Sequence, residues 1–373
     1  MAEVALRKLA PLTGFVQRHT SCAKLKVVMF RDNLVKMIRW VSTVWAGLFF
    51  ALFLFGQEKP EETPKQEEGP FSLRVDVDLV VLNLTVVNEN GANVTNLKKE
   101  DFTVYEDGIE QEISGFYPVE APFHLVMILD SSSSTRTSLH LIKRAASNFV
   151  DELRPDDRIA LGEINAFVRQ LQDFTSDRKV LKSAIQKITT YPYGGSRVYD
   201  GISLALKSLR DVKTGRKAIV ILSDGMENSS RIKFEKLRRV MAQGDAVLYP
   251  ITILNRKQQE SYLEDYIKKH REDDPYVRNA RASLSVLEEV YQIQTERLQV
   301  ISEESGGRIY LVGDLADLAG KYSEIAHELR NTFSLAYYSK NPWNEGTMRK
   351  IQVEVKNPSY RVRTRTTFYV ATE

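Results

Sequence analysis

Cysteine and histidine are scarce in this chain, and their scarcity argues against disulfides and zinc sites. The 373 residues include one cysteine, Cys22, so no disulfide can form within the chain and no metal site can be built on thiolates. The five histidines are scattered without zinc-binding spacing, and we expect them to be surface or packing residues. They are His19, His124, His140, His270 and His327.

An excess of charge of either sign is also missing. The 52 Lys and Arg residues are balanced by 49 Asp and Glu residues, and the net charge of +3 gives no case for nucleic-acid binding. No P-loop, GxSxG or HExxH motif is present, and no motif positions a histidine as the base of a hydrolytic triad. We therefore expect a protein that is not an enzyme. The length and the 43% hydrophobic residues indicate two or three folded domains.

The N-terminal part contains an uncharged apolar run, Trp40–Gly56, preceded by Arg31, Lys36 and Arg39. This order of basic and apolar regions is typical of a secretory signal. A membrane-spanning helix needs about 20 apolar residues, so the run is short but long enough to anchor the chain. We expect a basic leader at 1–36, with a misassigned start, and a signal peptide or membrane anchor at 37–56. The rest of the chain is then extracytoplasmic: secreted, periplasmic or anchored, with membrane contact through 37–56 alone.

Two stretches of β pattern flank the middle of the chain. A charged linker at 57–70 leads into 71–120, where apolar residues alternate and Asn90-Gly91 and Asp107-Gly108 predict hairpin turns. Residues 333–373 return to alternation and predict three strands, at 333–339, 349–357 and 360–370. Each stretch is too short to bury a good core alone. We therefore predict that both stretches join in one antiparallel β-sandwich.

Between them, residues 121–332 alternate buried strands with amphipathic helices. The strand at 123–130, "FHLVMILD", is continuously apolar, as expected for a strand covered on both faces. Ser176 is the expected N-cap of the helix that follows "RIALGEI". The alternation predicts an α/β fold with a doubly wound, mostly parallel sheet. The remaining strands are predicted at 158–164, 217–223, 246–253 and 308–312.

Oxygen-bearing side chains follow three of these elements. Asp130, Ser132 and Ser134 follow the first strand, Asp224 ends the strand "AIVILS", and Ser196 follows the glycine pair Gly194-Gly195. A plain turn is one interpretation, since Asp and Ser are common turn residues. Ligands in open α/β sheets, however, bind beyond the carboxyl ends of the strands. Two carboxylates and three hydroxyls suit a hard divalent cation, Mg²⁺ or alternatively Mn²⁺ or Ca²⁺. An open coordination position would accept a carboxylate from a protein partner.

The three motifs together carry a resemblance. "DSSSS" at 130–134, "GGS" at 194–196 and "SDG" at 223–225, in this order after buried strands and before a helix, resemble the von Willebrand factor type A domain. The resemblance covers about 122–332 and implies a metal-ion-dependent adhesion site. It implies that Ser132, Ser134 and Ser196 bind the ion directly or nearly so, and that Asp130 and Asp224 act partly through water.

One residue of the site departs from the family pattern, and the flanks of the domain extend the resemblance. Threonine is more frequent in the family at the position of Ser196, and Glu227 is expected to be a solvated rim residue. The flanks "DFTVYEDG" and "RKIQVEVKNPSYRVRTR" are similar to those of a bacterial group of secreted proteins with this domain.

Two questions stay open at this level. The insert at 254–300 is longer than a normal connection, and it is either a solvated helical elaboration or a cap over the ion. The expected function is metal-dependent protein binding. The alternatives are a metal-free structural scaffold and a metal-dependent hydrolase with Asp130 as nucleophile.

Overall fold

The computed structural model describes residues 79–117, 122–191, 195–213, 215–253, 256–342 and 344–370. The predictions for 1–36, 37–56 and 57–70, and the position of Gly194, lie outside these residues. Within these ranges no helix has both the length and the apolar character needed to cross a membrane.

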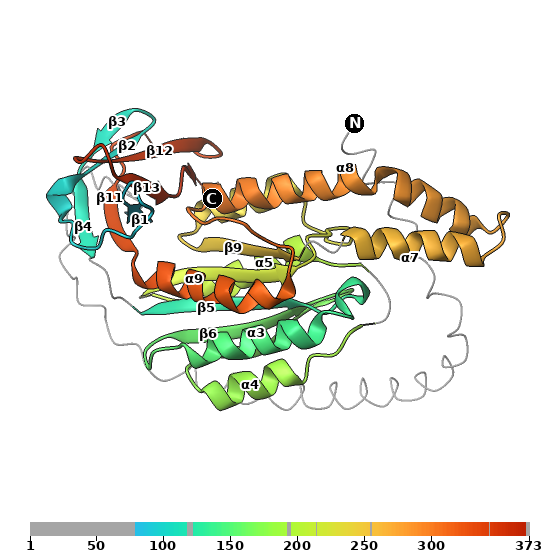
Figure 1. Cartoon of the computed structure of the whole chain (residues 1–373). Coiled ribbons are helices and arrows are strands. Elements are labelled where there is room, and N and C mark those ends of the chain that lie inside the picture. The colour runs from blue at the N-terminus through green and yellow to red at the C-terminus, as the bar shows by residue number, and fades with distance from the viewer. Residues whose placement is uncertain are drawn as a thin grey trace, which may run out of the picture. The chain divides into compact units, whose positions relative to one another are not determined.

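A six-stranded sheet in the order β10-β9-β8-β5-β6-β7 forms the centre of the α/β part (Figure 1). Neighbouring strands are parallel except for β7, which is antiparallel to β6. The doubly wound, mostly parallel sheet predicted from the sequence is therefore confirmed. The strands are β5 (Phe123–Asp130), β6 (Arg158–Ile164), β7 (Val168–Thr175), β8 (Arg216–Ser223), β9 (Val247–Ile253) and β10 (Tyr310–Val312).

Helices cover both faces of this sheet, which explains why its central strands are apolar throughout. One face packs against α3 (Leu139–Asp151), α4 (Arg178–Gln186) and α9 (Leu318–Arg330). The other face packs against α5 (Val198–Arg210), α6 (Phe234–Gln243) and the C-terminal end of α8 (Pro275–Glu304). A short 3₁₀ helix, η4 (Leu315–Asp317), precedes α9.

Two local features differ from the sequence prediction. Strand β7 was not predicted, because it is an edge strand whose residues are half-buried or exposed and show no clean alternation. The N-cap of α4 is Asp177 and not Ser176. The Asp177 carboxylate accepts the N–H groups of Lys179 and Val180 at 2.8 and 3.2 Å. The backbone N–H of Asp177 donates to the Thr175 hydroxyl.

Two antiparallel four-stranded sheets, β13-β1-β11-β4 and β14-β12-β2-β3, contain the strands from both flanks of the α/β part. Strand β1 lies between β11 and β13, so strands of the two flanking segments alternate in the first sheet. In the second sheet β12 pairs with β2, so this sheet also joins the two segments. Their apolar residues share one core, which confirms the predicted sandwich. The strands are β1 (Leu79–Val87), β2 (Phe102–Glu106), β3 (Ile109–Gln111), β4 (Ile113–Tyr117), β11 (Phe333–Tyr338), β12 (Met348–Val355), β13 (Arg361–Thr364) and β14 (Thr367–Tyr369), with η2 (Lys99–Asp101) before β2.

The turns of the sandwich only partly follow the prediction. Asp107-Gly108 joins β2 and β3 as expected, with positive φ angles of 50° and 81°. Asn90-Gly91 makes a tight turn, but a single bridge between Val87 and Asn93 follows it rather than a strand. The predicted strand 360–370 is two strands in different sheets. The chain crosses between them at Arg365, whose guanidinium is buried and donates to the carbonyl oxygen of Ala242 in α6.

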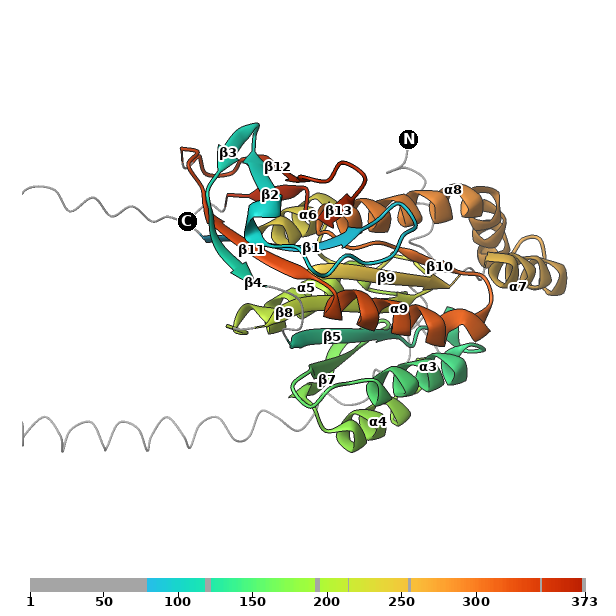
Figure 2. The same cartoon turned by 60° about the vertical axis from the view of Figure 1, so that its left-hand side comes forward.

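The insert forms a helical hairpin of α7 (Arg256–Lys269) and α8, which extends beyond the end of the central sheet (Figures 1 and 2). Asp274 caps α8 by accepting the N–H of Tyr276 at 2.8 Å, and Pro275 occupies the first helical turn, where its missing N–H has no cost. At the other end of α8, the Ser302 hydroxyl donates to the Leu248 carbonyl oxygen at 2.8 Å. The long helix is thereby fixed along β9.

Candidate functional site

The four serines after β5 form a tight bend around Asp130. The Asp130 carboxylate is fully buried, and its Oδ1 accepts the N–H of Ser132 at 2.8 Å. The bend continues into a 3₁₀ turn, η3 (Ser133–Thr135), and the Thr135 hydroxyl lies 3.0 Å from the carbonyl oxygens of both Asp130 and Ser132. The hydroxyls of Ser132 and Ser134 lie 3.0 Å apart, so these alternate serines point to the same side.

Two other segments meet the same carboxylate. Oδ2 of Asp130 accepts the hydroxyl of Ser196 at 2.8 Å and the hydroxyl of Ser223 at 2.6 Å. The structure therefore brings Asp130, Ser132, Ser134 and Ser196 into one hydrogen-bonded group. Asp224, also buried, is the residue after Ser223, and its Oδ1 accepts the N–H of Met226 at 3.1 Å.

Two glycines allow the loops of Ser196 and Asp224 to approach Asp130, one because a side chain would clash and one because of its backbone angle. A Cβ on Gly195 would lie 1.7 Å from the Asn228 amide oxygen, which accepts the N–H of Ser196 at 3.0 Å. The loop carrying Ser196 thus lies directly on the loop that follows Asp224. Gly225 has a φ of 79°, a conformation that glycine adopts without strain, and it turns the chain sharply after the acid.

The charge at the centre of the site is not neutralised by a basic side chain. Burial raises the pKa of Asp130, while hydrogen bonds from Ser132, Ser223 and Ser196 partly oppose the rise. Among the described residues, no Lys or Arg forms an ion pair with this carboxylate. A buried carboxylate surrounded only by hydroxyl and amide donors is stabilised by a bound cation.

The donor set also matches a hard cation in its chemistry. The described ranges contain no group of three or more His, Cys, Asp or Glu side chains placed to hold a metal. The predicted set instead combines the carboxylates of Asp130 and Asp224 with the hydroxyls of three serines, all of them oxygen donors. Hydrogen bonds join Asp130 with the serines, and Asp224 follows Ser223, which donates to Asp130. Oxygen-only sets of this kind suit Mg²⁺, Mn²⁺ or Ca²⁺.

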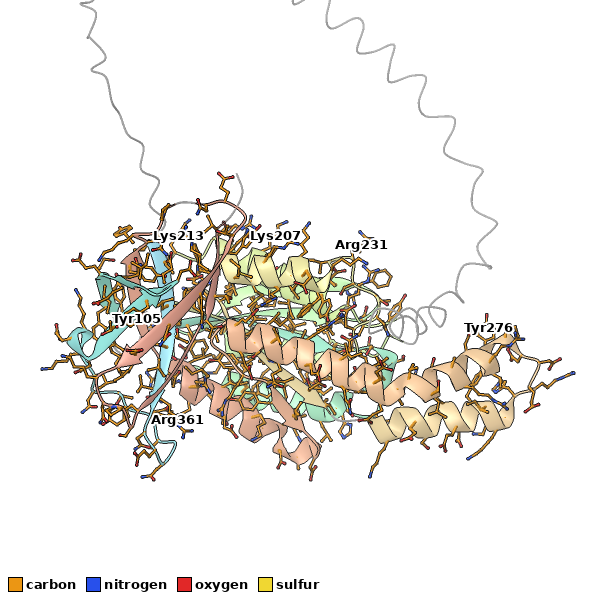
Figure 3. All side chains as sticks on the ribbon, turned by 90° about the horizontal axis from the view of Figure 1, so that it is seen from above. Tyr105, Lys207, Lys213, Arg231, Tyr276 and Arg361 are labelled. Carbon is orange, nitrogen blue, oxygen red and sulfur yellow. The ribbon has the colours of Figure 1, made fainter. Side chains whose placement is uncertain are left out.

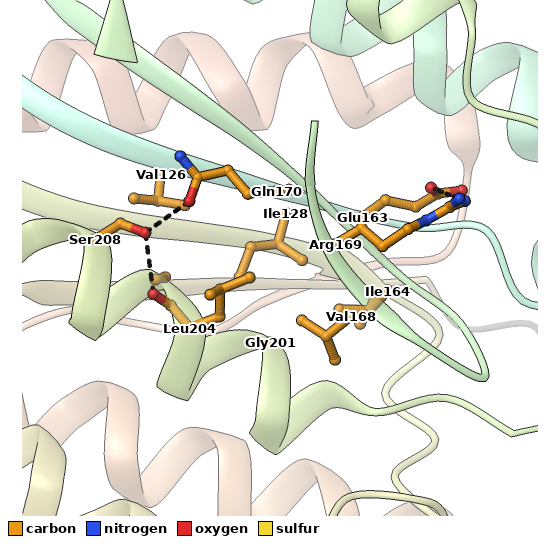
Figure 4. A pocket seen from close by; sticks show the side chains of 12 residues that line it. Val126, Ile128, Glu163, Ile164, Val168, Arg169, Gln170, Gly201, Leu204 and Ser208 are labelled. Atoms are coloured by element: carbon orange, nitrogen blue, oxygen red, sulfur yellow. Dashed lines mark hydrogen bonds and ion pairs between the residues drawn. The ribbon is translucent and has the colours of Figure 1, made fainter. Parts of the chain in front are cut away.

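A second buried carboxylate holds the back of the serine bend. Ser131 points away from Ser132 and donates to Glu163 Oε1 at 2.6 Å, and the Asn165 amide donates to the Ser131 hydroxyl at 3.0 Å. Arg169 pairs with the other oxygen of Glu163 at 2.6 Å (Figure 4). The cavity beside this pair measures only about 10 Å³, too small for a ligand. Sequence reasoning did not find these partners, because nothing in the local pattern marks Glu163.

The structure corrects the expectation that Glu227 is a solvated rim residue. Its carboxylate turns inward and accepts the N–H of Tyr199, in the first turn of α5, at 2.9 Å. It also accepts the Ser230 hydroxyl at 2.7 Å and the N–H groups of Ser229 and Ser230. The first N–H groups of a helix lack partners within the helix, which explains the attraction. Burial raises the pKa of Glu227, against these hydrogen bonds.

The helical insert packs against this acidic loop at its base. Met226 shares an apolar cluster with residues of both insert helices. Gln294, almost fully buried in α8, donates to the Glu227 carbonyl oxygen at 2.8 Å and accepts the Tyr199 hydroxyl at 3.2 Å. The insert is therefore solvated only on its outer surfaces, and its base contacts the loop next to Asp224. The buried insert residues in the apolar cluster with Met226 are Leu263, Ala280, Leu287, Val290 and Tyr291.

Residues 125–227 match the family model of the von Willebrand factor type A domain. The chain contains a von Willebrand factor type A domain. The matched segment runs from β5 through the loop after β8, and it contains all five residues singled out from the sequence, Asp130, Ser132, Ser134, Ser196 and Asp224.

Several proteins are similar to parts of this chain. An uncharacterized protein of Borreliella burgdorferi is 25% identical over 242 residues, and the match spans 62% of the length of that relative and 62% of this chain. BatB from Bacteroides thetaiotaomicron is 15% identical with a TM-score of 0.40, covering 55% of this chain and 98% of the other. A type A protein from Catenulispora acidiphila is 12% identical with a TM-score of 0.42, covering 80% and 74%. Proximal thread matrix protein 1 of the mussel byssus, with a zinc-occupied MIDAS motif, is 14% identical with a TM-score of 0.43, covering 60% and 49%.

Proposed function

We propose that this type A domain is an extracytoplasmic, metal-dependent protein-binding module. Asp130, Ser132, Ser134, Ser196 and Asp224 would hold Mg²⁺, with Mn²⁺ or Ca²⁺ as alternatives. The bound ion would supply an electrophilic position for a carboxylate of a protein partner. The observation that carries the proposal is the meeting of three separate segments on the buried Asp130 carboxylate, which has hydroxyl and amide partners.

The surroundings of the site support a function that depends on fixed geometry. Ser131 is tied to Glu163 behind the bend, and Glu227 ties the acidic loop to α5. Both arrangements hold the donor oxygens in place before any ion binds, which lowers the cost of ordering them. The apolar run 40–56, outside the described residues, supports the location outside the cytoplasm, as a secreted, periplasmic or membrane-anchored protein.

The proposal is one of binding without turnover. The sequence contains no motif that pairs a nucleophile with a histidine base. Ser132 also occupies the position two residues after Asp130, where a phosphoryl transfer site would use an acid or base. Hydrolysis of a generic phosphate or ester substrate that disappears in Asp130→Ala would contradict this part of the proposal.

Thermal denaturation tests the metal site. Mg²⁺ at 100 times its dissociation constant should stabilise the wild-type protein by about 2.7 kcal/mol. Asp130→Ala should show no such response, and Ser133→Ala, at the exposed serine of the same bend, should respond like wild type. The absence of a Mg²⁺ response in wild type would favour the metal-free scaffold.

A pull-down tests the binding role. Partner proteins captured in Mg²⁺ should be released by EDTA and should fail to bind Asp130→Ala. Capture that is equal in Mg²⁺ and EDTA, for both proteins, would contradict a metal-dependent partner.

A further inference from the structure

A long groove lies between α5 and α6, next to the turn that joins β6 and β7, and it plays no part in the proposed metal site. Its volume is about 830 Å³. The residues that line it on this side include Arg197, the N-cap of α5, and four residues of α5 that follow at intervals of three or four, namely Asp200, Leu204, Lys207 and Arg210. This spacing places them on one helical face. The helix rises about 20 Å over its thirteen residues, Val198–Arg210, so the groove is about that long.

The walls of this groove are strongly basic. Six cations line it: Arg197, Lys207 and Arg210 from the α5 side, and Arg231, Lys233 and Lys236 from the α6 side. All except Arg197 are exposed, and no ion pair of Lys207, Arg210, Arg231, Lys233 or Lys236 occurs within the described part of the chain. Figure 3 shows Lys207 and Arg231 along the same edge of the molecule.

Among the described residues that line the groove, the one acid, Asp200, does not neutralise these cations. Asp200 accepts the N–H groups of Arg231 and Ile232, at 3.1 Å to the nearer oxygen in each case. Its remaining ionic contact is a 3.7 Å pair with Arg197, whose Nε is buried and has no hydrogen-bond partner. The charge of the groove is therefore open to an external anion, in a chain whose total net charge is only +3.

The floor of the groove is apolar, and this character distinguishes between the classes of anionic partner that the cations could bind. Val168, Leu206 and Ile232 pack half-buried against the core, and Phe167 stands 52% exposed at one end. A lipid headgroup layer is flat and does not follow a groove between two helices. A nucleic acid presents phosphates but no aliphatic side chains for such a floor. A polypeptide that alternates acidic and apolar residues satisfies both the walls and the floor.

We propose that this groove binds an acidic amphipathic segment of a protein partner. Glu or Asp side chains of the segment pair with the cations of the walls, and its apolar side chains lie on the floor. The site is formed without any metal, so the inference does not rest on the metal-dependent function. It adds a second contact surface, which begins one residue after Ser196.

Fluorescence anisotropy in EDTA tests the groove alone. The probe is a fluorescein-labelled peptide of about 12 residues in which Glu and Leu alternate, added to the purified full chain. Lys207→Glu/Lys233→Glu/Lys236→Glu should bind the probe at least tenfold more weakly than wild type. The matched control, Lys179→Glu/Lys340→Glu/Lys356→Glu, makes the same change in net charge at exposed lysines outside the groove and should bind within twofold of wild type.

Two further comparisons distinguish the contributions and the alternatives. Raising NaCl from about 0.05 M to 0.5 M should weaken binding at least tenfold, because salt screens exposed charges. Replacing Leu by Ser in the probe should weaken it at least fivefold. Equal binding by the groove variant and wild type would overturn the proposal. So would displacement of the probe by phosphatidylglycerol vesicles or duplex DNA at lower concentration than by unlabelled peptide.

The groove variant also separates this proposal from the metal site. Its melting temperature should respond to Mg²⁺ like that of wild type, which shows that the fold is intact. If wild type shows no Mg²⁺ response but binds the probe through the groove, the metal proposal fails and this one stands.

Discussion

Replacement of Gln294 by leucine should loosen the helical insert from the acidic loop of the candidate metal site. The Gln294 side chain is 1% exposed and connects three elements, since it donates to the Glu227 carbonyl oxygen and accepts the Tyr199 hydroxyl. Leucine has a similar volume, so the substitution removes two hydrogen bonds without opening a large cavity.

The magnitude follows from what the substitution leaves behind. Each lost hydrogen bond contributes about 1 kcal/mol, and a buried carbonyl oxygen left without a donor costs about 1–3 kcal/mol. Gln294→Leu should therefore lower the free energy of unfolding by about 3–5 kcal/mol. Gln292→Leu is the matched control. Gln292 is exposed on the same helix and its side-chain amide donates to Glu288 one turn away, so its substitution should cost less than about 0.5 kcal/mol.

Urea denaturation measures the free energy, and hydrogen exchange shows where the structure opens. We expect faster exchange in 224–230, in 197–202 and in the N-terminal half of α8, with the β-sandwich unchanged. The double variant Tyr199→Phe/Gln294→Leu should be more stable than the sum of the single effects, because it no longer buries a hydroxyl without an acceptor.

The reasoning would be refuted by a Gln294→Leu protein as stable as Gln292→Leu with unchanged exchange in the acidic loop. That result would mean that the insert packs against the domain without depending on this contact. It would also favour the interpretation of the insert as a solvated helical elaboration without a role at the site.

Three further predictions concern charges buried at other places. Asp130→Asn should be at least as stable as wild type in EDTA by thermal denaturation, because it removes a buried charge that has no basic partner; a lower melting temperature would contradict this. Arg349→Met should lower the free energy of unfolding by about 3–5 kcal/mol in urea, because it leaves the fully buried Glu106 without its ion pair, and adding Glu106→Gln should recover part of the loss. Burial and two nearby cations lower the pKa of His124 below 6.5, so the folded state favours the neutral ring. Its contribution is present above pH 6.5 and is lost as pH falls through the folded pKa, and the wild-type urea midpoint should fall more than that of His124→Asn between pH 8 and pH 5.

The sequence predicted those parts of the fold that depend on local burial. The continuous apolar runs of β5, β8 and β9 reflect a sheet covered on both faces, and their carboxyl ends carry Asp130 and Asp224. Because the topology of an open α/β sheet brings these ends together, the strand prediction accounts for the closeness of the Asp130 bend to the loop of Ser223 and Asp224, whereas metal binding by these residues stays a prediction. Strand β7 was not predicted, because an edge strand whose residues are half-buried or exposed shows no clear hydrophobic pattern in the sequence.

The contacts that fix the site could not be read in this way. Ser223 reaches Asp130 over 93 residues of sequence, and Ser131 reaches Glu163 over 32. A serine before an acid and a glutamate in a strand have no periodicity that distinguishes a hydrogen-bond partner from a surface residue. Glu227 shows the same limit, because its inward turn depends on the free N–H groups of α5, a property of the assembled structure.

The arrangement around Asp130 favours a binding site over a fold that has merely kept its ligands. A fully buried carboxylate whose partners are hydroxyl and amide donors carries a desolvation cost that a bound cation would offset, although this one also joins three segments through hydrogen bonds. A metal-free scaffold would be more stable with a neutral side chain at this position. The bend is instead held from three directions, by Thr135, by Glu163 through Ser131, and by the Ser196 loop resting on Asn228. Rigid support around an uncompensated charge reduces the ordering cost of binding a cation, and this is the reason to expect the Mg²⁺ response in wild type and its absence in Asp130→Ala.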